Sequence, residues 1–391
     1  MGKNSVGMVI LLSVLLFGQC KEKKGNEIQE TRVIRVDMDR KPIEIQKTGL
    51  IRDYRLIQLD TPEEALIGEI DQVIVFGQYI YIADYSKSKA VFIFDTTGHF
   101  LNKIDRYGRA GDEYMQLRSL WVDTLRRTLN FISRVDKKWF IYDPEGGKLL
   151  EVRNLPKAFM QVVCDGTVRF GYSGNYREDA SQPYNVWCLD SLGGVERGFF
   201  EIPAGWESSL VGSGNALSLY KGQTDYVIPM DFHIYRIAGE NLTCPWYFDF
   251  GAYRWPSPDV TREQRQEILR NGQEYVDRIC EFQETDRFLL ATVIFKGQTR
   301  IIVHDKIKDK TEIGQLATWT EMYFMPFGYM ATLSAQQLIT FIPAAQIKRC
   351  CEGDEYNDFE KDYPEQVKRM KALFPVIHEE DNPFIAIYVL N

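Results

Sequence analysis

The residue types that most often carry catalysis occur in this chain of 391 residues, but their spacing points to no reaction. The histidines lie far apart, at His99, His233, His304 and His378, so no pair has metal-ligand spacing. We interpret His233 and His304, which fall inside predicted strands, as structural. Ser213 stands between two glycines but lacks the outer spacing of a Gly-x-Ser-x-Gly nucleophile turn. We therefore expect no nucleophilic catalysis, no metal and no other cofactor.

A glycine-containing segment from Gly108 to Tyr114 could cradle a phosphate, because glycines let backbone N–H groups approach an anion. No helix pattern follows the segment, as such a site requires, and it joins two predicted strands. We interpret it as a structural turn, with Arg109 and Glu113 able to pair. The residues of this turn are Gly108, Arg109, Gly111, Glu113 and Tyr114.

Two irregular segments, 172–177 and 250–255, combine aromatic and polar side chains in a way that suits recognition. Exposed Tyr, Trp and Arg side chains can stack on a sugar or anchor a partner protein. The alternative is that they pack inside the fold. The candidate ligand-binding residues are Tyr172, Asn175, Tyr176, Arg177, Tyr253, Arg254 and Trp255.

The N-terminus has the layout of a signal peptide over residues 1–19, with Lys3 followed by an apolar run from Val6 to Phe17. That run is shorter than the ~20 residues that cross a bilayer as a helix. Cys20 stands where bacterial lipoprotein signals place the lipidated cysteine, although Gln19 departs from the small residue usual there, which leaves ordinary cleavage as an alternative. We expect a lipid-anchored envelope protein at the outer membrane, on its periplasmic face or at the cell surface, with residues 20–50 as tether and lead-in.

The charge of the chain argues against nucleic acid as a partner. The formal net charge is −8 and the isoelectric point is about 5.3, whereas binding to a phosphate backbone draws on clustered Lys and Arg. We expect a monomer whose partners are the membrane, through the N-terminal lipid, and an unidentified protein or glycan.

An internal repeat determines the predicted fold. Short apolar strands that end in Asp, with Gly three residues later, occur at 91–95, 139–143 and 186–190, and their terminal aspartates are 48 and 47 residues apart. This is close to the ~40–50 residues of a propeller blade. Weaker copies lie at 233–237, 300–305 and 384–390.

The remaining elements complete six blades. Helical spacing over about 259–279 and 359–375 predicts two helical insertions. The last copy ends at the C-terminus without room for a fourth strand, while 54–59 is a strand without a blade. We therefore predict an all-β fold, a six-bladed β-propeller over 51–391 with four-stranded blades, in which the N-terminal strand closes the last blade.

The sequence resembles the six-bladed β-propeller lipoproteins, NHL-like propellers abundant in Gram-negative gut bacteria. The resemblance rests on Leu66-Ile67-Gly68-Glu69-Ile70, the Gly108–Tyr114 segment and Asp381-Asn382-Pro383-Phe384, and it extends over nearly all of the chain after the tether. It implies a propeller and export, but no defined reaction.

Two functions from different classes follow. We favour a non-catalytic binding or scaffolding module that holds a glycan, peptide or protein at the mouth of the propeller. The alternative is a lactonase- or lyase-like enzyme with a divalent cation on the pore axis, for which Asn175 and Asp231 are possible ligands.

Overall fold

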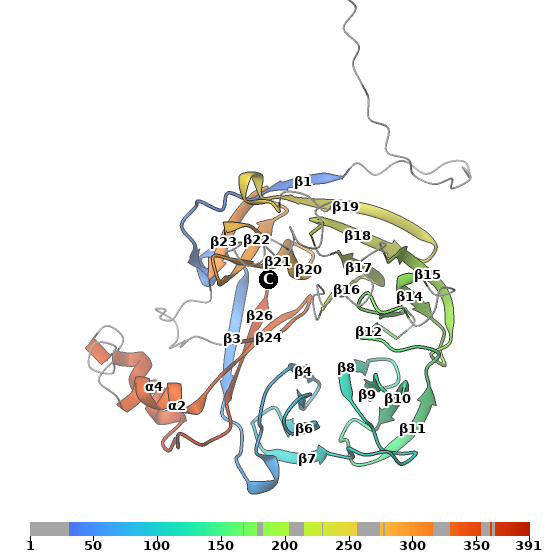
Figure 1. The fold of residues 1–391 in the computed structure, drawn as a ribbon. Helices are drawn as coiled ribbons and strands as arrows, with labels where there is room; N and C mark the ends of the chain where they lie inside the picture. Colours follow the sequence, from blue (N-terminus) through green and yellow to red (C-terminus); the bar gives the residue numbers. More distant parts are fainter. Residues whose placement is uncertain are drawn as a thin grey trace, which may run out of the picture.

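The computed structural model describes residues 31–166, 168–177, 183–202, 215–228, 230–255, 274–276, 278–315, 329–352, 360–361 and 364–391. The predicted signal peptide, Cys20 and most of the helix expected at 259–279 lie outside these residues. Six sheets, each built on four antiparallel strands, form a ring (Figure 1). The predicted six-bladed β-propeller is therefore confirmed. In the described part of the chain, no helix combines the length and the apolar character needed to cross a bilayer.

Each blade is a meander that runs outward from the ring centre. Blade 1 contains β4 (Gln72–Phe76), β5 (Tyr79–Asp84), β6 (Ala90–Asp95) and β7 (Phe100–Ile104), and blade 2 contains β8 (Leu117–Asp123), β9 (Thr128–Ser133), β10 (Lys138–Tyr142) and β11 (Leu149–Asn154). Blade 3 contains β12 (Gln161–Cys164), β13 (Arg169–Tyr172), β14 (Tyr184–Leu189) and β15 (Val195–Glu201), and blade 4 contains β16 (Leu217–Tyr220), β17 (Gln223–Val227), β18 (His233–Ala238) and β19 (Asn241–Asp249). Blade 5 contains β20 (Ile279–Glu284), β21 (Phe288–Phe295), β22 (Gln298–Asp305) and β23 (Lys310–Gln315).

The sixth blade joins the two ends of the described chain. It contains β24 (Tyr329–Leu333), β25 (Gln337–Ile342), β26 (Phe384–Leu390) and, as its outer strand, β3 (Ile51–Ile57). The strands β26 and β3 pair in antiparallel register, and the rings of Tyr54 and Tyr388 stack at 5.5 Å across the pair. The N-terminal strand thus closes the last blade, as predicted.

The repeated strand is the third strand of every blade, and the Asp-x-x-Gly pattern forms the turn that follows it. In blade 1 the Gly98 N–H donates to the Asp95 carbonyl at 3.1 Å, and the Asp95 carboxylate accepts the Thr97 N–H at 2.8 Å. Gly98 has a φ of +96°, and a Cβ there would lie 1.9 Å from the Gln58 carbonyl oxygen. Only glycine fits this close approach.

Two of the segments on which the family resemblance rests contact one another at the ring closure. The Asn382 amide is buried and donates to the carbonyls of Asp60 and Ala65, at 2.8 Å each, while its oxygen accepts the Ile67 N–H at 3.0 Å. The carboxylate of Asp84, on β5, accepts the N–H groups of Gly68 and Glu69. The segment between blades 6 and 1 is therefore held from both sides.

The Asp84 carboxylate is fully buried and accepts several backbone N–H groups. Burial alone would raise its pKa, but the hydrogen bonds from the Ser88 and Lys87 N–H groups outweigh burial and lower the pKa below its usual value. The folded structure therefore favours the charged form of Asp84, which lies at the end of β5 in blade 1.

The lead-in adds outer strands to two blades. The strand β1 (Arg32–Arg35) pairs in parallel with β19 of blade 4, and β2 (Ile43–Glu44) pairs in parallel with β23 of blade 5. The short helix η1 (Ile45–Thr48) then leads into β3. Residues 31–57 thus run along the outer edges of three successive blades, covering edges that would otherwise be open to pairing.

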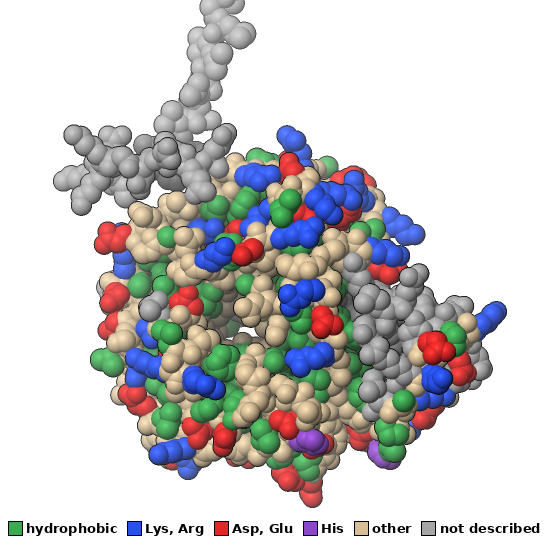
Figure 2. All heavy atoms as spheres, turned by 180° about the vertical axis from the view of Figure 1, so that it is seen from behind, with side chains coloured by type: hydrophobic (Ala, Val, Ile, Leu, Met, Phe, Trp, Pro, Cys, Tyr) green, Lys and Arg blue, Asp and Glu red, His purple; other side chains and the backbone are tan. Residues whose placement is uncertain are grey.

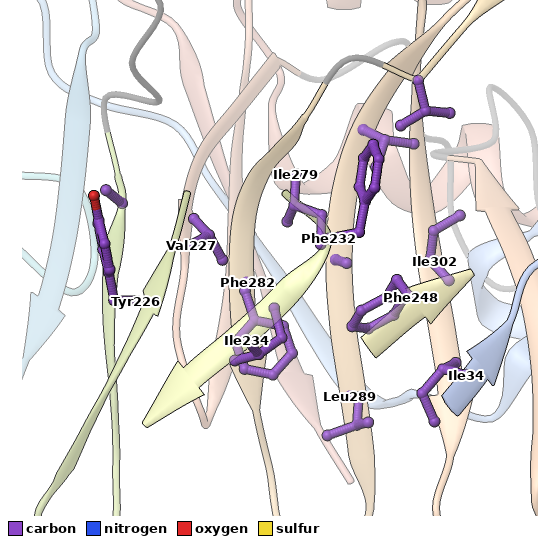
Figure 3. Close-up of a cluster of buried hydrophobic side chains, with 14 of the residues drawn as sticks. Ile34, Tyr226, Val227, Phe232, Ile234, Phe248, Ile279, Phe282, Leu289 and Ile302 are labelled. Carbon is purple, nitrogen blue, oxygen red and sulfur yellow. The ribbon is translucent and has the colours of Figure 1, made fainter. Parts of the chain in front are cut away.

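The apolar core lies between neighbouring blades, where side chains of facing sheets interlock. Between blades 4 and 5, Ile34 of β1 is buried in the same cluster as Phe248 and Ile302 (Figure 3). The N-terminal segment therefore contributes to the core as well as to hydrogen bonding.

Two helices lie outside the ring beside blade 6, in the connection between β25 and β26 (Figure 1). One of them, α4 (Pro364–Leu373), is the insertion expected at 359–375, and its Val367 is buried in the blade 6 core. Phe374 beyond it packs edge-on against Phe384 at 4.9 Å. The other, α2 (Ala344–Glu352), was not predicted from the sequence.

The first prediction concerns the ring closure. Replacing Asn382 with Ala leaves two carbonyls and one N–H without their partner, so we expect a loss of about 2–4 kcal/mol in the free energy of unfolding. Denaturant titration of the full chain measures this. Asn241→Ala, at an exposed position of β19, is the matched control and should change stability by less than ~0.5 kcal/mol. An equal effect of the two substitutions would contradict the assigned role.

Candidate functional site

The two faces of the ring differ in the length of their loops. One face, called the long-loop face here, carries the connections between blades and the loops between second and third strands, for example 105–116 and 173–183. The other face carries short turns such as 77–78 and 96–99. All the candidate ligand-binding residues predicted from sequence, and the Gly108–Tyr114 turn, belong to elements at the long-loop face.

In the first predicted recognition segment, the structure buries Tyr172 and Asn175 and leaves Tyr176 exposed. Tyr172 is 1% exposed and packs against Tyr226 at 5.8 Å, and burial raises its pKa to about 12. The Asn175 side chain accepts a hydrogen bond of 2.7 Å from the Asn185 amide. Tyr176 is exposed, with the Arg134 guanidinium 5.3 Å from its ring centre.

Arg177, at the end of this segment, donates to the Ile202 carbonyl at 3.3 Å.

The second predicted recognition segment also has both buried and exposed side chains. Trp255 is 2% exposed and belongs to the core between blades 4 and 5. Tyr253 donates to the Asp39 carboxylate of the lead-in, and the exposed Arg254 donates to the Tyr247 hydroxyl at 3.0 Å. The two segments thus contribute mainly packing and links between loops.

The Gly108–Tyr114 segment has the geometry of a turn that docks blade 1 onto blade 2. Gly108 N–H donates to the Tyr114 carbonyl at 3.0 Å, and the Glu113 carboxylate accepts the Ala110 N–H at 2.8 Å. Tyr114 is fully buried, and its hydroxyl donates to the Lys89 carbonyl at 2.6 Å. The ion pair within this loop joins Arg106 and Asp112 at 2.6 Å, and Arg109 is exposed.

The largest concavity among the described pockets is the central channel, with a volume of about 500 Å³. Figure 2 shows the face of the ring hollowed at its centre. The first strands of all six blades line this channel. Its volume falls in the range of about 300–1,000 Å³ typical of small-molecule sites.

Side chains on the first strands link neighbouring blades around the channel, and we call these contacts inter-blade bridges. In the bridge between blades 1 and 2, the Gln72 amide donates to the Leu120 carbonyl at 2.8 Å and accepts the Leu120 N–H at 3.1 Å. The inner edge of a first strand has no neighbouring strand, so these contacts satisfy its backbone groups.

Four more junctions between blades have such a bridge. In three of them a side chain both donates to and accepts from the backbone of one residue; these bridges join Thr332 to Val73, Ser119 to Val162 and Gln161 to Leu217. In the fourth, the Gln283 amide donates to the Leu219 carbonyl. Most polar side chains of the channel wall are therefore occupied by the fold itself.

Arg118 is an exception at the long-loop end of the channel. It is the second residue of β8, and its guanidinium lies 5.4 Å from the ring centre of Tyr85 of blade 1. Tyr85 is fixed in turn, because its hydroxyl donates to Gln72 at 2.5 Å and accepts the Leu120 N–H at 3.2 Å. Within the described part of the chain, the Arg118 guanidinium makes no hydrogen bond, and its Nε is buried without a partner. It is a cation held over an aromatic ring, with hydrogen-bond donors left for a ligand.

Glu281 is a second exception, near the same end of the channel but on blade 5. One carboxyl oxygen accepts a hydrogen bond from the Asn215 amide of the connection into blade 4. The other oxygen, Oε2, is buried without a hydrogen-bond partner among the described residues. Burial raises the pKa of Glu281, and the Asn215 hydrogen bond opposes this only in part.

A buried ionic cluster between blades 4 and 5 shows the contrasting, fully paired arrangement. Arg236 forms two hydrogen bonds with Asp225, at 2.6 and 2.7 Å, and one with Glu284 at 2.5 Å. Lys306 donates to the second Glu284 oxygen at 2.6 Å, and the Trp246 N–H also donates to Glu284. Every charge in this cluster has partners, as a structural role requires. Arg118 has no hydrogen-bond partner among the described residues, and Glu281 has one for only one of its two carboxyl oxygens.

The residues considered for a metal are occupied otherwise. Asp231 accepts hydrogen bonds from the His233 ring at 2.6 Å and the Tyr235 hydroxyl at 2.7 Å, and Asn175 is paired with Asn185. Across the described ranges, no three His, Cys, Asp or Glu residues gather where they could hold a metal ion. The channel is suited to binding a ligand through two separate charged residues, Arg118 and Glu281.

Sequence reasoning did not identify Arg118 or Glu281. They are 163 residues apart and line the same channel only because the ring places blades 2 and 5 on its opposite sides. The sequence does carry a signal for these two positions. A first strand must begin after each connection between blades, and Arg118 and Glu281 are the second and third residues of their first strands.

Comparison with protein families gives one match. Residues 31–389 match the family model described as a domain of unknown function, DUF4934. A search of curated proteins finds no match to the chain.

Two of the solved structures that are similar to this chain come from Bacteroides. A protein from Bacteroides fragilis described as a candidate exported protein is similar with a TM-score of 0.74 at 17% identity, covering 92% of this chain and 100% of that one. A member of the DUF4221 family from Bacteroides vulgatus is similar with a TM-score of 0.53 at 10% identity, covering 88% of this chain and 97% of that one. At these identities the likeness shows the fold alone.

The second prediction uses the pKa of Glu281. Because the fold raises this pKa, folding favours the protonated form, so the stability that Glu281 contributes is present at low pH and is lost as the pH rises through the folded-state value. Glu281→Gln should therefore raise the melting temperature at pH 8 and have little effect near pH 4. Calorimetry across this range measures the difference. A melting-temperature difference that is independent of pH would contradict the burial of an unpaired carboxyl.

Proposed function

We propose that this chain, which belongs to the DUF4934 family of domains of unknown function, is a non-catalytic binding module that takes a ligand in its central channel from the long-loop face. The observation that carries the proposal is the presence of two incompletely satisfied ionisable side chains, Arg118 and Glu281, on a channel whose other polar groups are largely engaged in inter-blade bridges. Buried polar groups without partners are costly, and such groups in a cavity mark sites that a ligand completes.

The arrangement supports binding better than reaction. General acid–base or nucleophilic catalysis needs groups that converge on one reacting atom. Arg118 and Glu281 instead belong to blades 2 and 5, which are opposite each other in a ring of six. Groups on opposite walls can hold the two ends of one ligand.

Burial of the predicted aromatic candidates bears on the ligand class. Tyr172 and Trp255 are core residues, so they present no open ring for a sugar to stack on. The channel wall combines partly exposed apolar residues such as Ile74 and Leu333 with charged groups at the long-loop end. This composition favours a peptide over a glycan.

We also propose an envelope location, with Cys20 as the lipidation site and the Lys21–Thr31 segment as a tether. The layout of residues 1–20 supports this, as does the description of the Bacteroides fragilis protein as a candidate exported protein. The described chain begins at Thr31 and passes directly into β1 on blade 4, so a tether would attach to the rim of the ring.

The third prediction tests binding in the channel. Trp121 contributes to the channel lining and packs in the core between blades 2 and 3, whereas Trp255 lies in the core between blades 4 and 5, away from the channel. In the full chain labelled with 5-fluorotryptophan, a pool of short peptides with free ends should shift the ¹⁹F resonance of Trp121 and leave that of Trp255 unchanged. Trp121→Phe and Trp255→Phe assign the two resonances.

A parallel titration uses a pool of short oligosaccharides. Movement of the Trp121 resonance with either pool supports a ligand site in the channel. If neither pool moves it at millimolar concentration, or if Trp121 and Trp255 move together, the channel-binding proposal is wrong.

The fourth prediction concerns the anchor. Radiolabelled palmitate supplied to cells that make the full chain should be incorporated into the protein, and Cys20→Ala should abolish the label, because Cys20 would be the acylated residue. Cys164→Ala, at a buried position of β12, is the control and should retain the label. Equal labelling of the Cys20→Ala protein would rule out the anchor.

A further inference from the structure

We infer that the channel ligand is a short peptide with both ends free, whose C-terminal carboxylate binds Arg118 and whose N-terminal amine binds Glu281. This inference rests on the proposed function and names the ligand class of the same site.

The Arg118 side chain has the properties of a carboxylate receptor. Its guanidinium is always charged and presents a planar fork that matches a carboxylate in two parallel hydrogen bonds. The fork lies over the Tyr85 ring in a cation–π contact, 5.4 Å from the ring centre, and the bonds from Tyr85 to Gln72 and from Leu120 to Tyr85 fix that ring. No described carboxylate lies within ion-pair distance of Arg118, so the fork is available to a ligand.

Asp71 is an acidic residue that interacts electrostatically with Arg118 and could compete with a ligand for this fork. Its carboxylate accepts the Tyr85 N–H at 2.7 Å, which holds it at the start of β4. It attracts Arg118 at longer range without forming an ion pair with it. Asp71 therefore lowers the affinity of the long-loop end of the channel for simple anions, and it favours ligands that also carry a positive charge.

The Glu281 carboxyl has the properties of an amine receptor. The Asn215 amide fixes one oxygen, and the carboxyl has capacity to accept further hydrogen bonds. Its burial disfavours the charged form in the free protein. An ammonium group placed beside it would supply both the missing donor and the compensating charge.

The geometry of the ring relates the two receptors. Both are near the N-terminal ends of first strands, and all first strands begin at the long-loop face. Because blades 2 and 5 are opposite, a ligand that reaches both crosses the channel mouth. Free peptides carry a carboxylate and an ammonium group at neutral pH, and their side chains would meet partly exposed apolar residues of the channel wall such as Val163 and Leu219.

The fifth prediction compares capped peptides. Trialanine, tetraalanine and pentaalanine are titrated into the full chain as free, N-acetylated, C-amidated and doubly capped forms, with calorimetry and the Trp121 resonance as readouts. For the length that binds best, we expect each cap to weaken binding by about 10–100-fold, because each removes one charge-assisted contact.

Substitutions assign each cap to its receptor. Arg118→Gln should bind the C-terminal acid and amide equally while still discriminating against N-acetylation, and Glu281→Gln should show the reverse pattern. Arg109→Gln, an exposed arginine on the same face, is the matched control and should discriminate as the wild type does. An unchanged Trp255 resonance establishes that each variant is folded.

The outcomes separate the two proposals. If capped and free peptides bind equally and move the Trp121 resonance, or if only oligosaccharides move it, the peptide-end inference is wrong while channel binding stands. If discrimination persists in both variants, Arg118 and Glu281 are not the receptors. If no probe moves the resonance, both proposals fail.

Discussion

The structure depends on satisfying the inner edges of six first strands. In a ring of antiparallel meanders, each first strand has a neighbour on only one side, so its remaining N–H and C=O groups face the channel. The inter-blade bridges pair these groups with side chains of the adjacent blade, as Thr332 does for Val73 and Gln161 does for Leu217. Such bonds contribute only ~1 kcal/mol each, but a buried backbone group left unpaired costs more. The bridges therefore set the spacing of the blades and the width of the channel.

This constraint also explains why the candidate site has few members. Glutamine, serine and threonine side chains on the first strands are used to complete the ring, so the channel has little polar capacity left for a ligand. Arg118 and Glu281 remain because neither takes part in a bridge, and each is fixed by a neighbour from the preceding blade, Tyr85 and Asn215. The fully paired cluster around Arg236 shows that the same fold can satisfy buried charges where they serve packing alone.

Much of the fold could be predicted because the third strands carry a strong local signal. The apolar strand followed by Asp-x-x-Gly repeats at blade length, and the pairing of β3 with β26 follows from a strand left over at each end. The strands β1 and β2 could not be recognised in the same way, because the segment 31–44 is rich in charged residues and only Ile34, Val36 and Met38 of it enter the core. The helix α2 spans only nine residues, and Ile347 is its one large aliphatic residue, so its sequence carries little periodic signal.

The candidate site was less predictable, for a physical reason. Whether Tyr172 or Trp255 faces solvent depends on which blade its strand packs against, and composition carries no information on that. Asn382 shows the opposite case, in which a sequence motif did mark an important contact but its three backbone partners at 60–67 became visible only in the closed ring. Arg118 and Glu281 are related only by the sixfold arrangement of blades, so their pairing across the channel required the structure.

The most direct test of this account is a crystal structure of the full chain grown with the free-ended alanine peptide that binds best. The account predicts electron density for the peptide across the long-loop end of the channel, with its carboxylate within about 3 Å of the Arg118 guanidinium and its amine beside Glu281. Density confined to the outer surface of the ring, or an ordered peptide in the channel that contacts neither side chain, would contradict it.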